Sequence, residues 1–79
     1  MFFVYVLKSL KDGKLYTGQT SNLQERVTWH NSGKQKSTKF RLPVTLVYSE
    51  PYATRNEAMK REKELKTGKG RDLLKKILK

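Results

Sequence analysis

Residues 2–18, FFVYVLKSLKDGKLYTG, decide the fold. The run over residues 2–7 is aromatic and β-branched, which is typical of a buried strand. Asp12 and Gly13 favour a hairpin turn, and residues 15–17 supply a short return strand. The stretch therefore predicts two antiparallel strands at the start of the chain.

The rest of the chain predicts a third strand and three helices. The expected elements are a helix at about 21–31, a strand at 44–48, a helix from 54 to about 67, and a last helix carrying Leu73, Leu74, Ile77 and Leu78. Thr20 or Ser21 is the expected cap of the first helix, and Thr54 with Glu57 forms a capping box for the second. The order ββαβαα predicts an α+β fold in which helices flank a small three-stranded antiparallel sheet. A chain of 79 residues can bury only one modest core, so we expect one domain over residues 1–79.

Charge narrows the choice of partner. Eighteen lysines and arginines against seven acidic residues give a net charge of +11, and such an excess favours binding to nucleic acid. An anionic membrane surface or a ribosome would attract the same charge. No apolar stretch approaches the ~20 residues of a membrane span, and the absence of cysteine excludes disulfides and thiolate-bound zinc. We therefore expect a cytoplasmic protein whose partner is nucleic acid rather than a membrane.

Glu62 is the most informative residue for chemistry. At about 100° per residue it falls in the middle of the apolar stripe of its helix, with Ala58 and Leu65 on one side and Met59 on the other, whereas Glu64 lies on the charged face. A carboxylate that faces a core is costly unless it is paired, hydrogen-bonded or bound to a metal. A structural explanation is an ion pair with Arg26 or with a lysine at the edge of the stripe. The functional alternative is a single ligand for Mg²⁺ or Mn²⁺.

Two further pairs of side chains suggest a site. Arg26 and His30 lie one helical turn apart, where an arginine fork suits phosphate oxygens and a histidine can transfer a proton near neutral pH. A lone histidine is, however, more often a structural hydrogen-bonding group. Trp29 is expected on the opposite flank of this helix. Tyr5 and Tyr16 share one face of the hairpin, but a two-residue turn leaves them several positions apart, so a bulge or a longer turn is needed to bring them together.

These residues, in this order and spacing, resemble the GIY-YIG nuclease superfamily. The tripeptides 3–5 (FVY) and 16–18 (YTG) correspond to its paired signature, and essentially the whole chain is similar to its small stand-alone branch. The later matching segments are Asn22-Leu23, Arg26, His30-Asn31-Ser32-Gly33, Pro43, Leu46-Val47-Tyr48, Glu57-Ala58 and Arg61-Glu62. The chain departs from the pattern at Phe3, which replaces a glycine, and at Gln19, where some relatives carry a lysine.

The resemblance implies metal-dependent hydrolysis of nucleic-acid phosphodiester bonds. It implies that Tyr5 and Tyr16 line the catalytic face and that one phenol activates or orients the attacking water. Arg26 would stabilise charge on the phosphate, and His30 would act as an acid, a base or a phosphate contact. Glu62 would hold one divalent cation, Mg²⁺ or Mn²⁺.

Further residues are expected to contact nucleic acid. The resemblance implies that Gly18 allows close backbone approach beside Tyr16, whereas the charge of a basic loop indicates that this loop would hold the phosphate backbone without reading its sequence. The loop residues are Lys34, Lys36, Lys39 and Arg41. The favoured function is an endonuclease that acts on DNA more readily than on RNA. The alternatives are a catalytically silent basic module that binds nucleic acid and a basic protein that binds a ribosome or a membrane.

Overall fold

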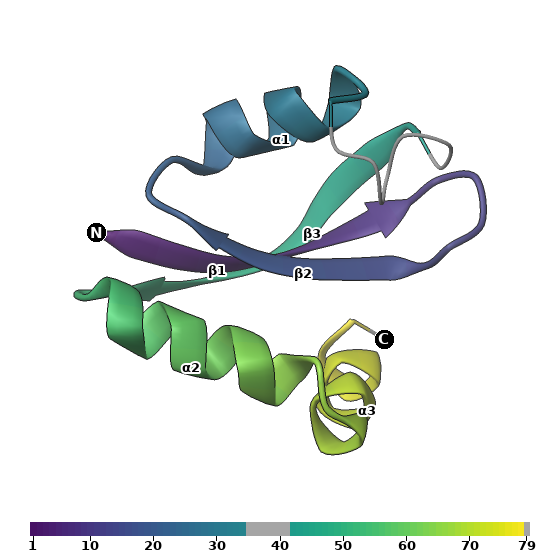
Figure 1. The fold of residues 1–79 in the computed structure, drawn as a ribbon. Coiled ribbons are helices and arrows are strands. Elements are labelled where there is room, and N and C mark those ends of the chain that lie inside the picture. Colours follow the sequence, from purple (N-terminus) through teal and green to yellow (C-terminus); the bar gives the residue numbers. More distant parts are fainter. Residues whose placement is uncertain (35–41, 79) are drawn as a thin grey trace.

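The computed structural model describes residues 1–34 and 42–78. The elements are β1 (Phe2–Ser9), β2 (Leu15–Thr20), α1 (Leu23–Asn31), β3 (Val44–Tyr52), α2 (Arg55–Leu65) and α3 (Gly68–Ile77). Helix α1 covers one face of the sheet, and α2 and α3 cover the other (Figure 1). This arrangement confirms the expected α+β class and the order ββαβαα. None of the helices in the described ranges is long and apolar enough to span a membrane.

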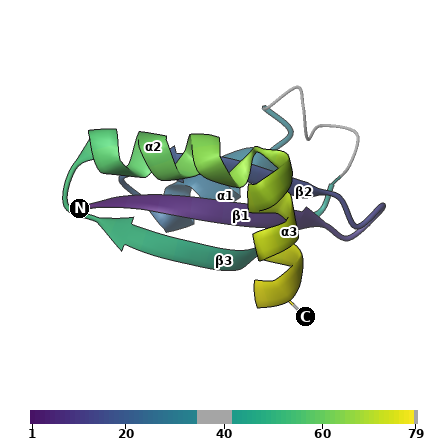
Figure 2. The same cartoon turned by 90° about the horizontal axis from the view of Figure 1, so that it is seen from below.

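The sheet has the order β2-β1-β3, and both pairings are antiparallel. The central strand β1 is apolar on both sides because both of its faces are covered. Val4 and Val6 belong to the core beneath α2 and α3, whereas Tyr5 and Leu7 belong to the core beneath α1. Figure 2 shows α2 running along the sheet and α3 crossing it near one end. Strand β2 is therefore an edge that both helical layers flank.

The hairpin differs from the sequence prediction in its turn. Tyr5 pairs with Gly18, and the strands are joined by a loop over residues 10–14 in which Gly13 has a φ of 74°. A two-residue turn was expected, and the longer loop shifts the register so that Tyr16 lies only two positions from the partner of Tyr5. Both tyrosines pack in the core on the α1 side, as the alternation predicted. The longer turn therefore supplies the shift that brings them near each other.

Two predicted boundaries are also corrected. The first helix is capped by Asn22, whose side-chain oxygen accepts a hydrogen bond from the Glu25 N–H at 3.1 Å, so neither Thr20 nor Ser21 is the cap. Strand β3 continues beyond residue 48 to Tyr52, because an edge strand tolerates Pro51. The capping box of Thr54 at the start of α2 is confirmed.

A half-buried polar cluster fixes α2 to the sheet. Arg61 donates to Glu50 from Nε at 2.8 Å and from Nη2 at 3.2 Å, and the hydroxyls of Tyr48 and Tyr52 donate to the same carboxylate. Burial alone would raise the pKa of Glu50, but the hydrogen bonds from Arg61 and the two tyrosines outweigh it and lower that pKa. Because the cluster holds α2 at Arg61, it also fixes the direction of the next residue, Glu62.

Candidate active site

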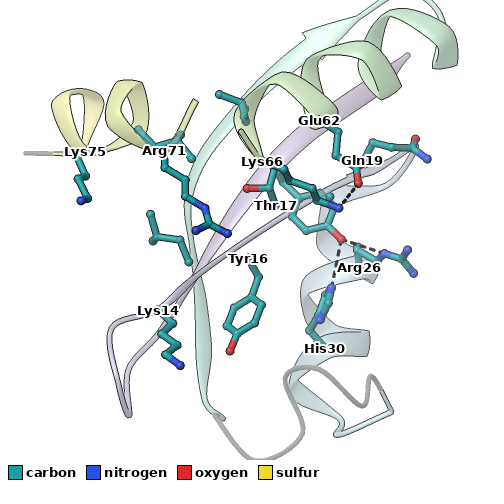
Figure 3. A pocket seen from close by; sticks show the side chains of 15 residues that line it. Lys14, Tyr16, Thr17, Gln19, Arg26, His30, Glu62, Lys66, Arg71 and Lys75 are labelled. Atoms are coloured by element: carbon teal, nitrogen blue, oxygen red, sulfur yellow. Dashed lines mark hydrogen bonds and ion pairs between the residues drawn. The ribbon is translucent and has the colours of Figure 1, made fainter. Parts of the chain in front are cut away.

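A cleft of about 910 Å³ runs beside the edge strand β2 and is lined by residues of α1, β1, β2, α2 and α3 (Figure 3). All five residues predicted to be catalytic line it, together with Gly18. They are Tyr5, Tyr16, Arg26, His30 and Glu62. The fold thus brings together, in one concave surface, side chains that lie up to 57 positions apart in the sequence.

Tyr5 connects two polar residues of α1, Arg26 and His30. The Nε of Arg26 lies 3.3 Å from the Tyr5 hydroxyl, and the same oxygen lies 3.2 Å from Nε2 of His30. A guanidinium N–H only donates, so the tyrosine oxygen accepts from Arg26. Its own proton can then point to His30, provided that Nε2 carries none. The three side chains therefore form a hydrogen-bonded relay that opens into the cleft.

His30 has the electrostatic environment that this relay needs. The side chain is buried, and its burial, followed by the nearby positive charge of Arg26, holds its pKa below the ordinary value of 6.5. The imidazole is therefore neutral at pH 7 and can accept a proton from Tyr5. Trp29 was expected on the opposite flank, but its ring makes an edge contact with the ring of His30. The Arg26 guanidinium carbon lies over the Trp29 ring, 4.5 Å from the ring centre. Trp29 is part of the support of Arg26, a role that helical angles alone did not reveal.

The lowered pKa of His30 predicts how stability depends on pH. The unfolded chain binds the proton more readily, so stability is constant above the unfolded pKa of about 6.5 and falls as pH drops through the folded pKa. Urea unfolding of the wild type between about pH 7.5 and 5 should show this fall, and His30→Gln should flatten it. An equal fall in both proteins would assign the pH dependence to other groups.

Gly18 makes room for Tyr5. A Cβ built on Gly18 would lie 2.4 Å from the Tyr5 hydroxyl and 2.6 Å from Cζ, so the phenol passes directly across this backbone position. The sequence assigned Gly18 to close approach of a nucleic-acid backbone beside Tyr16. In the structure the space that it leaves is taken by Tyr5, and a contact with nucleic acid stays a prediction.

Gly18→Ala should therefore displace Tyr5 and destabilise the fold by about 2 kcal/mol, the usual scale of overpacking. The loss should nearly vanish in a Tyr5→Val background, because the clashing ring is then absent. Urea unfolding of the four proteins of this double-mutant cycle measures the coupling. Additive losses would show that the two positions do not interact.

Glu62 lies half-buried at the wall of the cleft, on the stripe that the sequence predicted. Its carboxylate accepts from Nζ of Lys66 at 2.7 Å, and the two side chains are 22% and 55% exposed. The pairing is thus with a lysine at the edge of the stripe and not with Arg26. Exposed pairs at this spacing contribute only ~0.3–0.5 kcal/mol, which a divalent cation can readily outweigh.

The donor set fits a single hard cation. One carboxylate at an open wall is the kind of ligand that Mg²⁺ accepts while it keeps several waters and binds substrate phosphate. Across residues 1–34 and 42–78 no cluster of three acidic or histidine side chains forms a closed metal cage. The Tyr16 hydroxyl is buried and has no hydrogen-bond partner among the described residues, and such a group costs about 1–3 kcal/mol until something pairs with it.

The basic loop is only partly within the described residues. Lys34 is exposed beside Trp29, in a groove separate from the cleft. Lys36, Lys39 and Arg41 lie outside the described residues. The structure adds four cations to the cleft that the sequence did not single out, and these are Lys14, Lys66, Arg71 and Lys75. A sequence signal existed for two of them, since Arg71 and Lys75 flank the apolar position 74 at helical spacing.

The sheet and its three helices form the fold of a nuclease family. The chain belongs to the family of GIY-YIG catalytic domains, whose model matches residues 1–76, so the resemblance found in the sequence is confirmed. A UPF0213 protein of Staphylococcus haemolyticus is 49% identical over 76 residues, covering 95% of this chain and 92% of that protein. One from Staphylococcus epidermidis is 54% identical over 66 residues, covering 82% and 79%.

The fold has a solved counterpart. The solution NMR structure of a UPF0213 protein from Bacillus halodurans aligns with a TM-score of 0.57 and 36% identity, covering 98% of this chain and 85% of that one. The names of these relatives state no activity, substrate or metal. Membership of this family places the chain in a class of nucleases.

Proposed function

We propose that this protein is a divalent-metal-dependent endonuclease that hydrolyses phosphodiester bonds of DNA in the cleft beside β2. The observation that carries the proposal is the Tyr5 hydroxyl, held between Arg26 and His30 in the same cleft as Glu62. Hydrolysis of a phosphodiester needs a positioned water, an acceptor for its proton and neutralisation of charge on the phosphate. The cleft offers a group for each task.

The proton route follows from the hydrogen bonds. Tyr5 can accept a proton from the attacking water while it passes its own to Nε2 of neutral His30. Arg26 keeps its terminal N–H groups for the non-bridging oxygens of the phosphate, because it contacts Tyr5 through Nε. Tyr16 also lines the cleft, and its buried hydroxyl has no hydrogen-bond partner among the described residues.

Glu62 is the residue that we assign to the cation. Mg²⁺ or Mn²⁺ bound there would supply positive charge against the phosphate. The fixed hydrogen bonds between Arg61 and Glu50 hold the helix so that Glu62 faces the cleft. Lys66, now paired with Glu62, contributes a second positive charge at this wall.

The test is cleavage of labelled DNA at low salt, as single strand, duplex and flap, with Mg²⁺, Mn²⁺ or EDTA. An RNA of the same sequence runs beside them. Metal-dependent cleavage of DNA supports the proposal, and the panel defines the preferred shape of the substrate. Binding without cleavage that EDTA leaves unchanged would overturn it. That outcome favours the silent binding module, to which the Lys66 pair at Glu62 and the glutamine at position 19 also point.

A further inference from the structure

One wall of the cleft is basic and lies away from the relay of Tyr5, Arg26 and His30. Lys14, from the loop between β1 and β2, and Arg71 and Lys75, from α3, line this wall and are exposed. In Figure 3, Arg71 extends from α3 toward the middle of the cleft, with Lys14 and Lys75 on the side opposite Arg26 and His30. The three cations therefore extend the cleft beyond the catalytic groups.

Helix α3 holds two of these cations in fixed positions. Arg71 and Lys75 lie one turn apart beside Leu74, which is 1% exposed and belongs to the core. The start of the helix is capped by Thr67. Gly70 packs so tightly on the end of α2 that a Cβ there would meet backbone atoms at 2.1 to 2.7 Å. The helix axis is thus fixed, and the charged edge of α3 faces the cleft by construction.

The charge of this wall is not compensated. Among the described residues, Lys14, Arg71 and Lys75 form no ion pair, whereas Lys66 is paired with Glu62. Glu62 is the one carboxylate that lines the described part of the cleft. A concave surface with this excess attracts a chain of negative charges that can enter it.

We infer that Lys14, Arg71 and Lys75 form a second phosphate-binding stretch for DNA. The backbone passes from the catalytic groups on α1 along β2 to α3, where the three cations contact phosphates away from the bond that is cut. The inference rests on the proposed function. Contacts of this kind set the register of the strand and do not read its sequence.

The experiment compares Arg71→Gln/Lys75→Gln with Lys69→Gln/Lys76→Gln. Both variants remove two charges from α3, but Lys69 and Lys76 do not line the cleft. Binding of a labelled duplex of about 20 base pairs is followed by fluorescence anisotropy in EDTA between 50 and 200 mM salt. Each lost phosphate contact lowers the salt slope by about 0.9, so the first variant should lose about 2. Between 50 and 200 mM salt, the loss of affinity of this variant should therefore be about tenfold smaller than the loss of affinity of the wild type.

Equal slopes in the two variants would overturn the inference. Thermal unfolding checks that both variants keep the fold, as expected for exposed side chains. Cleavage of the same duplex with Mg²⁺ separates this inference from the proposed function. A wild type that binds with the expected slope but never cuts leaves the phosphate-binding stretch standing and removes the hydrolysis. If the wild type cuts the duplex but both variants have equal slopes, the proposed hydrolysis stands and the phosphate-binding stretch is removed.

Discussion

Arg26→Ala is expected to lower kcat for DNA cleavage about a thousandfold, with a much smaller change in KM. Arginines that stabilise transferring phosphoryl groups have effects of this size, equal to about 4 kcal/mol of transition-state stabilisation. In this cleft the Nε of Arg26 donates to the Tyr5 hydroxyl, and in the proposed mechanism its remaining N–H groups would bind the phosphate. Arg26→Lys keeps the charge but loses the planar fork, so it should recover only part of the loss.

Arg55 is a matched control for this experiment. Its guanidinium also stacks on an aromatic ring, 4.8 Å from the centre of Phe2, and it donates to Gln19 at 3.3 Å, but it does not line the cleft. Arg55→Ala should change kcat by no more than about twofold, as surface substitutions usually do. If Arg26→Ala weakened binding and left kcat near the wild-type value, Arg26 would be a contact for the bound substrate and not for the transition state.

The sequence grouped most of the candidate residues because helix and strand geometry is regular. Glu62 lies beside Ala58 and Leu65, as the rotation of about 100° per residue predicts, and both of those neighbours are almost completely buried. Tyr5 and Tyr16 share the α1 face because side chains alternate along strands. Periodicity fixes which face a side chain occupies, and this was enough to group the candidate residues.

The remaining features depend on interactions that periodicity does not contain. Asp12 and Gly13 indicate a turn but not its length, and the loop over residues 10–14 decides how far apart the tyrosines lie. Helical spacing places Arg71 and Lys75 on one edge of α3, but the direction in which this edge faces depends on how α3 packs against α2. These are tertiary effects, and they supply the walls of the cleft.

Glu62→Gln should abolish metal-dependent cleavage, with a loss of three orders of magnitude or more. The amide keeps the volume of the side chain but lacks the charge that a hard cation requires, and a cation at a phosphate is worth several kcal/mol. The substitution also breaks the exposed pair with Lys66, which costs well under 1 kcal/mol, so the variant should fold. Binding of Mn²⁺, followed by its electron paramagnetic resonance signal, should weaken in parallel with cleavage.

Glu64→Gln separates this effect from a general loss of negative charge. Glu64 is on the same helix and is 64% exposed, where it contacts Arg61 and does not line the cleft. Its replacement should change cleavage by no more than about twofold. A Glu62→Gln variant that still cut DNA with Mg²⁺ and bound Mn²⁺ like the wild type would show that the cation is held by other groups. Glu62 would then have only a structural role, as the partner of Lys66 in an ion pair.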